Sequence, residues 1–346
     1  MEQIAKKAVR DGKIEIIRFL AAVIIMNGHA VSLGFNSERP FMYGWIYVEF
    51  FFIVTGFFTA GYFSKKNSNG YPGYINILKV SAGYTVSKFI PFLAYTIIPV
   101  IITYVFRNLP FLSEAGKVSF INRLTRLPAE LLYLSEASPH GTLSYPLWFL
   151  SAMFIALPFI CIILNIKIVK LDLFIAVGYC AFYYQIADFG LIAMPNTIFR
   201  AFGGMCLGII IWHFTEWIRV KTIRFPLRVM ITVIEVFTFI LPLFISFMNY
   251  SMRDFQLICF ILWMAAIQSG QSLIPKINSS FFNFLGKLSM PIYVWHFAVI
   301  CIINYFLPNA QMGLKIALFW ILTFAIGIAN LIIVNSVKKS KKKQPV

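Results

Sequence analysis

The sequence predicts an all-α protein that crosses a membrane many times, and three observations lead to this fold class. Of the 346 residues, 60% are hydrophobic and only 12% are charged, whereas a soluble domain carries about 25% charged residues. The mean hydropathy is +0.79. The apolar residues come in runs of about 20, the length that a helix needs to cross a bilayer core of about 30 Å. An ordinary soluble enzyme, a disordered chain and a disulfide scaffold are therefore excluded.

Ten apolar runs are long enough to be spans, and the fifth and eighth are shorter than the rest. The first run contains Arg18, Asn27 and His29. A cleavable signal peptide has a clean apolar centre, so we expect a retained helix there. The runs lie at residues 14–34, 43–63, 84–106, 147–165, 170–187, 193–214, 228–248, 254–270, 284–307 and 313–337.

Basic residues indicate how these spans are oriented. Ten spans place both termini on one side, and that side holds 22 of the 30 Lys and Arg residues. Because Lys and Arg favour the cytoplasmic side, we expect cytoplasmic termini and a multi-pass protein of a cell membrane, specifically a bacterial plasma membrane. The expected domains are a basic segment at 1–13, a membrane domain at 14–337 with an outward loop at 107–146, and a basic tail at 338–346.

The formal net charge of +17 fits this topology and an anionic lipid surface. No nucleic-acid-binding motif is visible, so nucleic acid is not an expected partner. The five cysteines all lie within apolar runs and form no CxxC pair, which predicts small hydrophobic residues and neither disulfides nor a metal site. No HExxH or comparable ligand spacing occurs, so we expect no metal.

Charged side chains within spans cost about 2.5–3.5 kcal/mol each, which makes them candidate functional groups. Arg18 and His29 are eleven residues apart in the first span, a spacing that returns to nearly the same helix face about 16 Å further along the axis. This geometry suits an elongated anionic ligand held at one end and reacting at the other. The alternative is that Arg18 extends to the membrane surface and His29 bonds a neighbouring helix.

Three further spans place polar groups in the outer half of the membrane. Glu49 and Arg200 are expected at about the depth of His29, and His296 lies somewhat deeper. A carboxylate from the neighbouring second span could orient the imidazole of His29, as in acyl-transfer sites. Glu235 has no evident role and is expected to pair with a cation. The small residues of GMCLG at 204–208 predict close helix packing.

Six segments, in order along almost the whole chain, resemble those of the membrane acyltransferase-3 family. The first has an Arg and a His separated by ten residues, and the second has consecutive phenylalanines before Thr55 and a glycine. Met153 departs from the members that have glutamate there. The segments are RFLAAVIIMNGH (18–29), VEFFFIVTGFF (48–58), SKFIP (87–91), PLWFLSAMF (146–154), RAFGGMCLG (200–208) and LSMPIYVWH (288–296).

The resemblance implies an enzyme that moves an acyl group from cytoplasmic acyl-CoA to a hydroxyl of an extracytoplasmic or lipid-linked sugar or polysaccharide. The acyl group is expected to be acetyl, with acetyl-CoA as a donor substrate and no bound cofactor. His29 matches the family's essential histidine and Arg18 its arginine, while Lys88 stands where a basic residue is expected near the acyl-CoA entrance.

The expected chemistry follows from these positions. His29, oriented by Glu49, acts as general base on the acceptor hydroxyl or carries the acyl group itself, and Arg18 and Lys88 hold the CoA phosphates. The remaining candidates are expected to bind the acceptor or stabilise the oxyanion; they are Arg200, His296, Tyr293 and Trp148. A transporter or flippase of lipid-linked sugars and a structural or assembly protein are the alternatives.

Overall fold

The chain is mostly helical in the part that the computed structural model describes, which is residues 11–34, 40–66, 73–108, 123–138, 142–166, 168, 170–189 and 196–343. No strand occurs within these ranges. The long helices are α1 (Gly12–His29), α2 (Tyr47–Lys66), α3 (Tyr74–Asn108), α6 (Leu147–Asn165), α7 (Leu171–Phe189), α8 (Asn196–Arg219), α9 (Phe225–Phe247), α10 (Arg253–Ser269), α11 (Ser280–Phe306) and α12 (Met312–Lys343). The short helices are η1 (Ala30–Leu33), η2 (Gly44–Ile46), α5 (Leu127–Leu131) and η5 (Ser135–Ala137).

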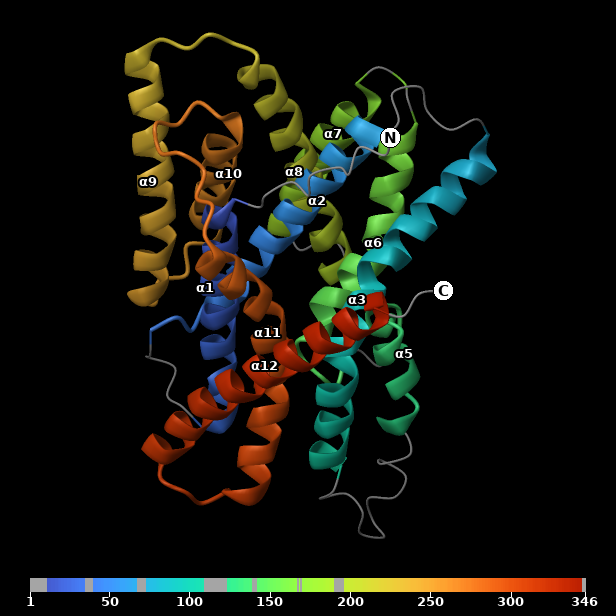
Figure 1. Cartoon of the computed structure of the whole chain (residues 1–346), viewed down its shortest axis with the longest axis vertical. Coiled ribbons are helices and arrows are strands. Elements are labelled where there is room, and N and C mark those ends of the chain that lie inside the picture. The colour runs from blue at the N-terminus through green and yellow to red at the C-terminus, as the bar shows by residue number, and fades with distance from the viewer. Residues whose placement is uncertain are drawn as a thin grey trace.

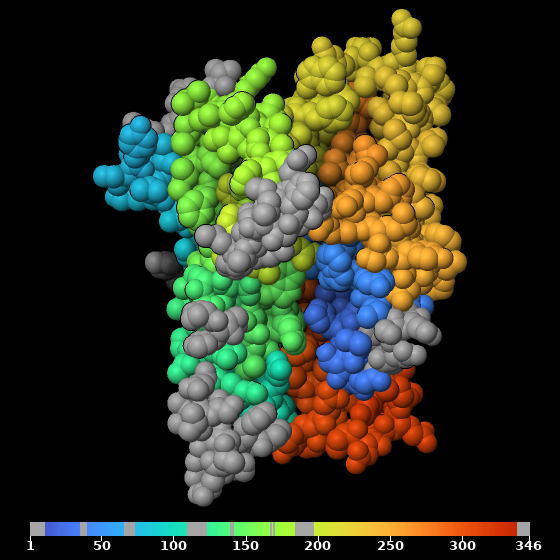
Figure 2. Space-filling model, turned by 180° about the vertical axis from the view of Figure 1, so that it is seen from behind, coloured from blue at the N-terminus to red at the C-terminus, as the bar shows by residue number. Residues whose placement is uncertain are grey.

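The helices form two groups that pack against each other (Figure 1). In one group α2 packs along α8, while α6, α7 and α10 also contact α8 and α9 lies against α10. In the other, α1 packs along α11, which also contacts α3 and α12. Contacts of α3 with α6 and of α1 with α2 join the groups. Seen from behind, α9 and α10 (gold to orange) lie above the orange-red end of α11 and start of α12 (Figure 2).

Each of the ten expected spans corresponds to one long helix. Among the described residues, eight helices are long and apolar enough to cross a membrane, which confirms a polytopic all-α membrane protein. The other two, α7 and α10, are the runs that the sequence marks as short. The number of spans and the side of the termini stay predictions. Most of the expected segment at 1–13, the end of the tail at 338–346 and the middle of the loop at 107–146 lie outside the described residues.

The third span was expected to begin at residue 84, but α3 begins at Tyr74 and is 35 residues long. The correction has a physical reason. The added segment, YINILKVSAG at 74–83, contains no proline and follows Gly73, which has φ +81, so it continues the helix while most of its side chains are exposed. The helix is therefore longer than the apolar run that predicts it.

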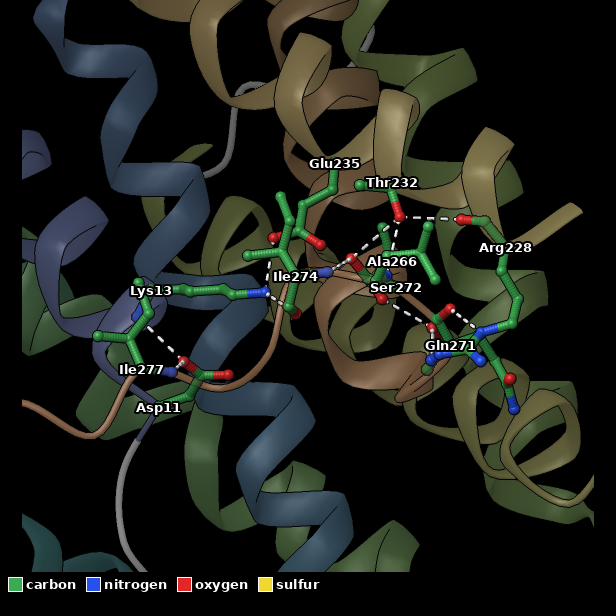
Figure 3. A network of polar contacts seen from close by, with 12 residues as sticks. Asp11, Lys13, Arg228, Thr232, Glu235, Ala266, Gln271, Ser272, Ile274 and Ile277 are labelled. Carbon is green, nitrogen blue, oxygen red and sulfur yellow. Dashed lines mark hydrogen bonds and ion pairs between the residues drawn. The ribbon is translucent and has the colours of Figure 1, made fainter. Parts of the chain in front are cut away.

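The start of α1 is fixed by polar contacts to the segment between α10 and α11 (Figure 3). The Asp11 carboxylate caps the helix by accepting from the backbone N–H of Lys13 at 3.1 Å and from that of Ile277 at 3.2 Å. The N–H of Gly12 donates to the Ile277 carbonyl at 2.7 Å. An N-cap carboxylate satisfies helix N–H groups that have no partner within the helix, so this contact sets both where α1 begins and where it sits.

Lys13 and Glu235 form a buried ion pair next to this cap (Figure 3). The Nζ atom of Lys13 lies 2.7 Å from Glu235 Oε1 and also donates to the Ile274 carbonyl at 2.8 Å. Both side chains are less than a tenth exposed. Glu235 therefore pairs with a cation, as expected, and its role is to hold α9 against the start of α1.

Close packing of α2 against α8 forms the centre of the protein. Phe50, Phe52 and Phe57 of α2 are at most 1% exposed. A Cβ atom at Gly56 would overlap the Met205 carbonyl oxygen, and one at Gly208 would overlap that of Ile53. The small residues predicted to serve helix packing therefore do so, because only a hydrogen side chain lets the two backbones approach this closely.

Replacing Gly56 with Ala should lower the thermal unfolding midpoint of the detergent-solubilised protein. The added methyl meets backbone and not a flexible side chain, and overpacking of this kind costs about 1–3 kcal/mol. Gly83→Ala is the matched control, because nothing lies within 4 Å of its added Cβ and alanine is the better helix former. Equal midpoints for the two variants would contradict the packing assigned to Gly56.

Candidate functional site

Two histidines from different helices face each other at the end of α1. The ring of His29 lies 5.1 Å from the ring of His296 in the middle of α11, centroid to centroid. His29 is half-buried and His296 is fully buried. Among the described residues, neither ring nitrogen of His296 has a hydrogen-bond partner. Buried polar groups are nearly always bonded, so this pair is a place where a substrate group or water would be accommodated.

Two tyrosines complete the surroundings of the histidine pair. The ring of Tyr145 lies 6.2 Å from that of His29, and the ring of Tyr293 lies 6.0 Å from that of His296. Tyr293 is buried and donates its hydroxyl to the Pro146 carbonyl at 3.0 Å. This bond ties α11 to the first turn of α6, so three helices define the position of the pair.

A second polar group lies between α2 and α8. Arg200 donates its Nε–H to Glu49 Oε1 and its Nη2–H to the Trp45 carbonyl, the latter at 3.1 Å. Its guanidinium carbon lies 5.1 Å from the Trp45 ring and 5.2 Å from the Trp148 ring. Arginine between two indole rings gains cation–π stabilisation, so Arg200 is held on both faces and along one edge.

The glycines of α8 make room for this ion pair. A Cβ atom at Gly204 would lie 2.6 Å from Cβ of Phe52 and 3.5 Å from Glu49 Oε2. Glu49 Oε2 is buried and has no hydrogen-bond partner among the described residues. Glu49 thus lies against the glycine backbone of α8. One of its oxygens accepts from Arg200, and the other has no hydrogen-bond partner among the described residues.

Aromatic side chains connect the two polar groups. The ring of Phe149 lies 5.7 Å from that of Tyr293 and 4.9 Å from that of Phe52. Phe52 in turn lies 6.4 Å from Trp148, which contacts Arg200. Tyr293 is also close enough to Arg200 to interact electrostatically with its charge. The candidate residues His29, His296, Tyr293, Trp148, Arg200 and Glu49 therefore belong to one continuous region.

One expected contact takes a different form. Glu49 was expected to orient His29, but its Oε1 accepts from Arg200, and its Oε2 has no hydrogen-bond partner in the part of the chain that the structure describes. A guanidinium offers a charge-assisted bond that a neutral imidazole does not, and Arg200 arrives from the helix that packs closest to α2. In this structure Glu49 orients Arg200.

The two expected donor-binding cations lie on separate helices. Arg18 binds Glu15 at 3.0 Å, and Glu15 lies directly against Gly286 of α11, where a Cβ atom would overlap its carboxylate. Lys88 is exposed on α3, and its Nζ lies 4.9 Å from the Tyr84 ring and 5.9 Å from the Tyr62 ring. Their role toward a donor stays a prediction.

Sequence reasoning missed two residues of this site, and one histidine–carboxylate pair away from it. Trp45 and Tyr145 lie outside the motifs that suggested the other candidates, and only their position beside Arg200 and His29 reveals them. A histidine–carboxylate pair also forms between His213 of α8 and Asp172 of α7, 2.8 Å apart. No group of three His, Cys, Asp or Glu side chains placed to hold a metal ion occurs within the described ranges.

Comparison with known proteins gives one match. A family model described as an acyltransferase domain (Acyl_transf_3) matches residues 11–335. No curated protein and no solved structure shows a significant match. The matched range contains every candidate residue from Arg18 to His296.

The Glu49–Arg200 pair should behave as a buried ion pair. Glu49→Leu should lower the free energy of unfolding by about 3–5 kcal/mol, because it leaves a guanidinium buried without its carboxylate, and Glu49→Leu/Arg200→Met should recover much of the loss. Thermal unfolding of the single and double variants measures both effects.

The control is the exposed pair of Arg219 with Glu216, where Glu216→Leu should cost at most about 1 kcal/mol. A double variant no more stable than Glu49→Leu would show that the two side chains are not coupled.

Proposed function

The chain belongs to the acyltransferase-3 family of membrane acyltransferases, and we propose that it moves an acetyl group from cytoplasmic acetyl-CoA to a hydroxyl of an extracytoplasmic or lipid-linked sugar. The observation that carries the proposal is the pair of imidazoles of His29 and His296, 5.1 Å apart at the meeting of α1 and α11. The proposed setting is the plasma membrane of a bacterium, with a surface polysaccharide or its precursor as the acceptor.

His29 is the proposed general base. Its imidazole takes the proton of the acceptor hydroxyl while the hydroxyl oxygen attacks the thioester carbonyl carbon. The carbon–sulfur bond then breaks, the sulfur leaves with the proton as the free thiol of CoA, and the acceptor keeps the acetyl ester. An alternative order has His29 take the acetyl group first and pass it on. His296, which is fully buried beside it, would bind the same reacting group from the other side.

Arg200 is the proposed electrostatic partner of the reaction. The developing oxyanion needs fixed donors or positive charge in a site that excludes water. Arg200 is held by Glu49 and by the rings of Trp45 and Trp148, so its orientation costs little at the moment of reaction. Trp148 and Tyr293 would contact the acceptor from the same region.

The donor is proposed to lie along the face of α1. Arg18 and His29 both lie on the side of α1 that meets α11, Arg18 through Glu15 at Gly286 and His29 at His296. Their separation of about 16 Å along the helix would let an extended pantetheine arm reach from phosphates at Arg18 and Lys88 to the imidazole.

His29→Ala should lower acetyl transfer at least roughly a hundredfold, the smaller end of what a general base contributes. Transfer is measured as radiolabel from acetyl-CoA that enters glycan in membranes carrying the protein. His296→Ala should also lower it. His213→Ala is the matched control, because His213 binds Asp172 on another pair of helices, and its transfer should equal that of the wild type.

Unimpaired transfer by a correctly inserted His29→Ala protein would refute the role of His29. If the wild-type protein, in membranes of its own source organism, transfers no label to glycan, the proposed acceptor class is refuted.

Arg18→Ala should raise the KM for acetyl-CoA by roughly tenfold to a hundredfold while kcat changes little, because a hydrogen bond to a charged group is worth about 1.5–3 kcal/mol. The KM for acetyl-pantetheine, which lacks the nucleotide phosphates, should not change. Lys79→Ala, an exposed lysine on α3, is the control for general loss of positive charge. Equal effects on both donors would contradict phosphate binding by Arg18.

A further inference from the structure

Arg107, at the end of α3, lies near the histidine pair, and two further arginines follow it in the chain at 123 and 126. The guanidinium carbon of Arg107 is 5.8 Å from the Tyr145 ring and 5.6 Å from the Phe297 ring, and its Nη1 donates to the Leu143 carbonyl at 2.6 Å. Arg123 donates to the Arg107 carbonyl at 3.3 Å. Its pKa is lowered by burial and by the positive charges of Arg107 and Arg126.

The described carboxylates of the same region bind backbone and hydroxyl groups, and Glu130 also lies close enough to Arg107 to interact with its charge. Glu130 is fully buried and accepts from the backbone N–H groups of Leu143 and Ser144; burial raises its pKa. Glu136 accepts from the hydroxyls of Thr142 and Thr197. Among the described residues of this region, three arginines therefore stand near two acids, of which Glu130 holds the backbone before α6 and Glu136 binds two hydroxyl groups.

Two of the arginines have donors to spare. A guanidinium has five N–H donors, and within the described ranges Arg107 uses one of them, in its bond to Leu143. The Nε atom of Arg126 is buried and has no hydrogen-bond partner within the described ranges. Unsatisfied buried donors call for an acceptor, and arginine is well suited to carboxylate and phosphate groups.

Tyr145 links these arginines to the site. Its side chain is 48% exposed although its ring contacts His29, Phe297 and Arg107. The exposed part of the Tyr145 ring, held beside the imidazole of His29, offers a flat, apolar surface to the C–H face of a sugar ring. The backbone N–H groups of Leu143 and Ser144, which donate to Glu130, fix the position of Tyr145.

These cations also stand apart from the proposed donor site. Arg107 follows Lys88 by nineteen residues in α3, which is about 28 Å along a helix. The predicted topology places the three arginines on the side opposite the termini, where basic residues are disfavoured. Neither donor phosphates near Lys88 nor the usual charge bias of cytoplasmic loops accounts for them.

We propose that Tyr145, Arg107 and Arg126 form the acceptor subsite and that the acceptor is an anionic saccharide, one that bears a carboxylate or a phosphate. Tyr145 contacts the sugar ring, and the two guanidiniums bind the anionic group. The hydroxyl to be acetylated is thereby presented to His29. This inference rests on the proposed function, because it names the chemical class of the acceptor for that reaction.

The test returns the wild-type or variant gene to a deletion strain of the source organism and supplies its membranes with radiolabelled acetyl-CoA. The labelled glycans are separated by anion exchange. Label should elute with the acidic fraction, and Arg107→Gln and Arg126→Gln should each lower it roughly tenfold or more without changing the KM for acetyl-CoA. Tyr145→Ala should lower it and Tyr145→Phe should restore it. Arg219→Gln, at an exposed arginine of α8, should match the wild type.

The inference would be overturned, with the proposed function intact, by label in the neutral fraction or by a raised KM for acetyl-CoA in the arginine variants, which would assign the cations to the donor. Acidic label that persists in both arginine variants would overturn it as well. If neither fraction contains label that depends on the protein, the proposed function itself is refuted.

Discussion

The packing of α1 along α11 is the contact on which the rest of the site depends. At one end the carboxylate of Glu15 lies against Gly286, and at the other the ring of His29 lies against that of His296. Glycine at the first contact allows a charged side chain to lie between the helices without separating them. The Asp11 cap and the Lys13–Glu235 pair fix where α1 begins, so the position of His29 at its far end follows from the length of the helix.

Much of the fold could be predicted because long apolar runs have few alternatives in a membrane. The run at 147–165 coincides with α6, while α3 exceeds its run because helix continues wherever nothing stops it. The site was harder. Charges inside spans identified Arg200 and Glu49 but not their contact with each other. The sequence of one helix does not tell which other helix it packs against. Tyr145 gave no signal, since an aromatic residue before a span is ordinary.

The two sets of cations lie in different parts of the protein. Arg18 lies within α1 and Lys88 near the middle of α3, whereas Arg107 lies at the end of α3, beside Tyr145 and so on the His29 side of α1. If each set binds the anionic part of a different substrate, the two substrates approach from opposite sides and meet at the imidazoles. The protein would then pass only an acyl group across the membrane while both charged molecules stay where they are.

The site is assembled across the boundary between the two helix groups. His29 and His296 belong to the group of α1 and α11, whereas Glu49 and Arg200 belong to that of α2 and α8, and the hydroxyl bond from Tyr293 to Pro146 crosses between them. Helices tilt when hydrophobic length and lipid thickness differ. A change of tilt in one group would alter the spacing between imidazole and guanidinium, so we expect the rate of the proposed reaction to depend on the acyl-chain length of the surrounding lipids.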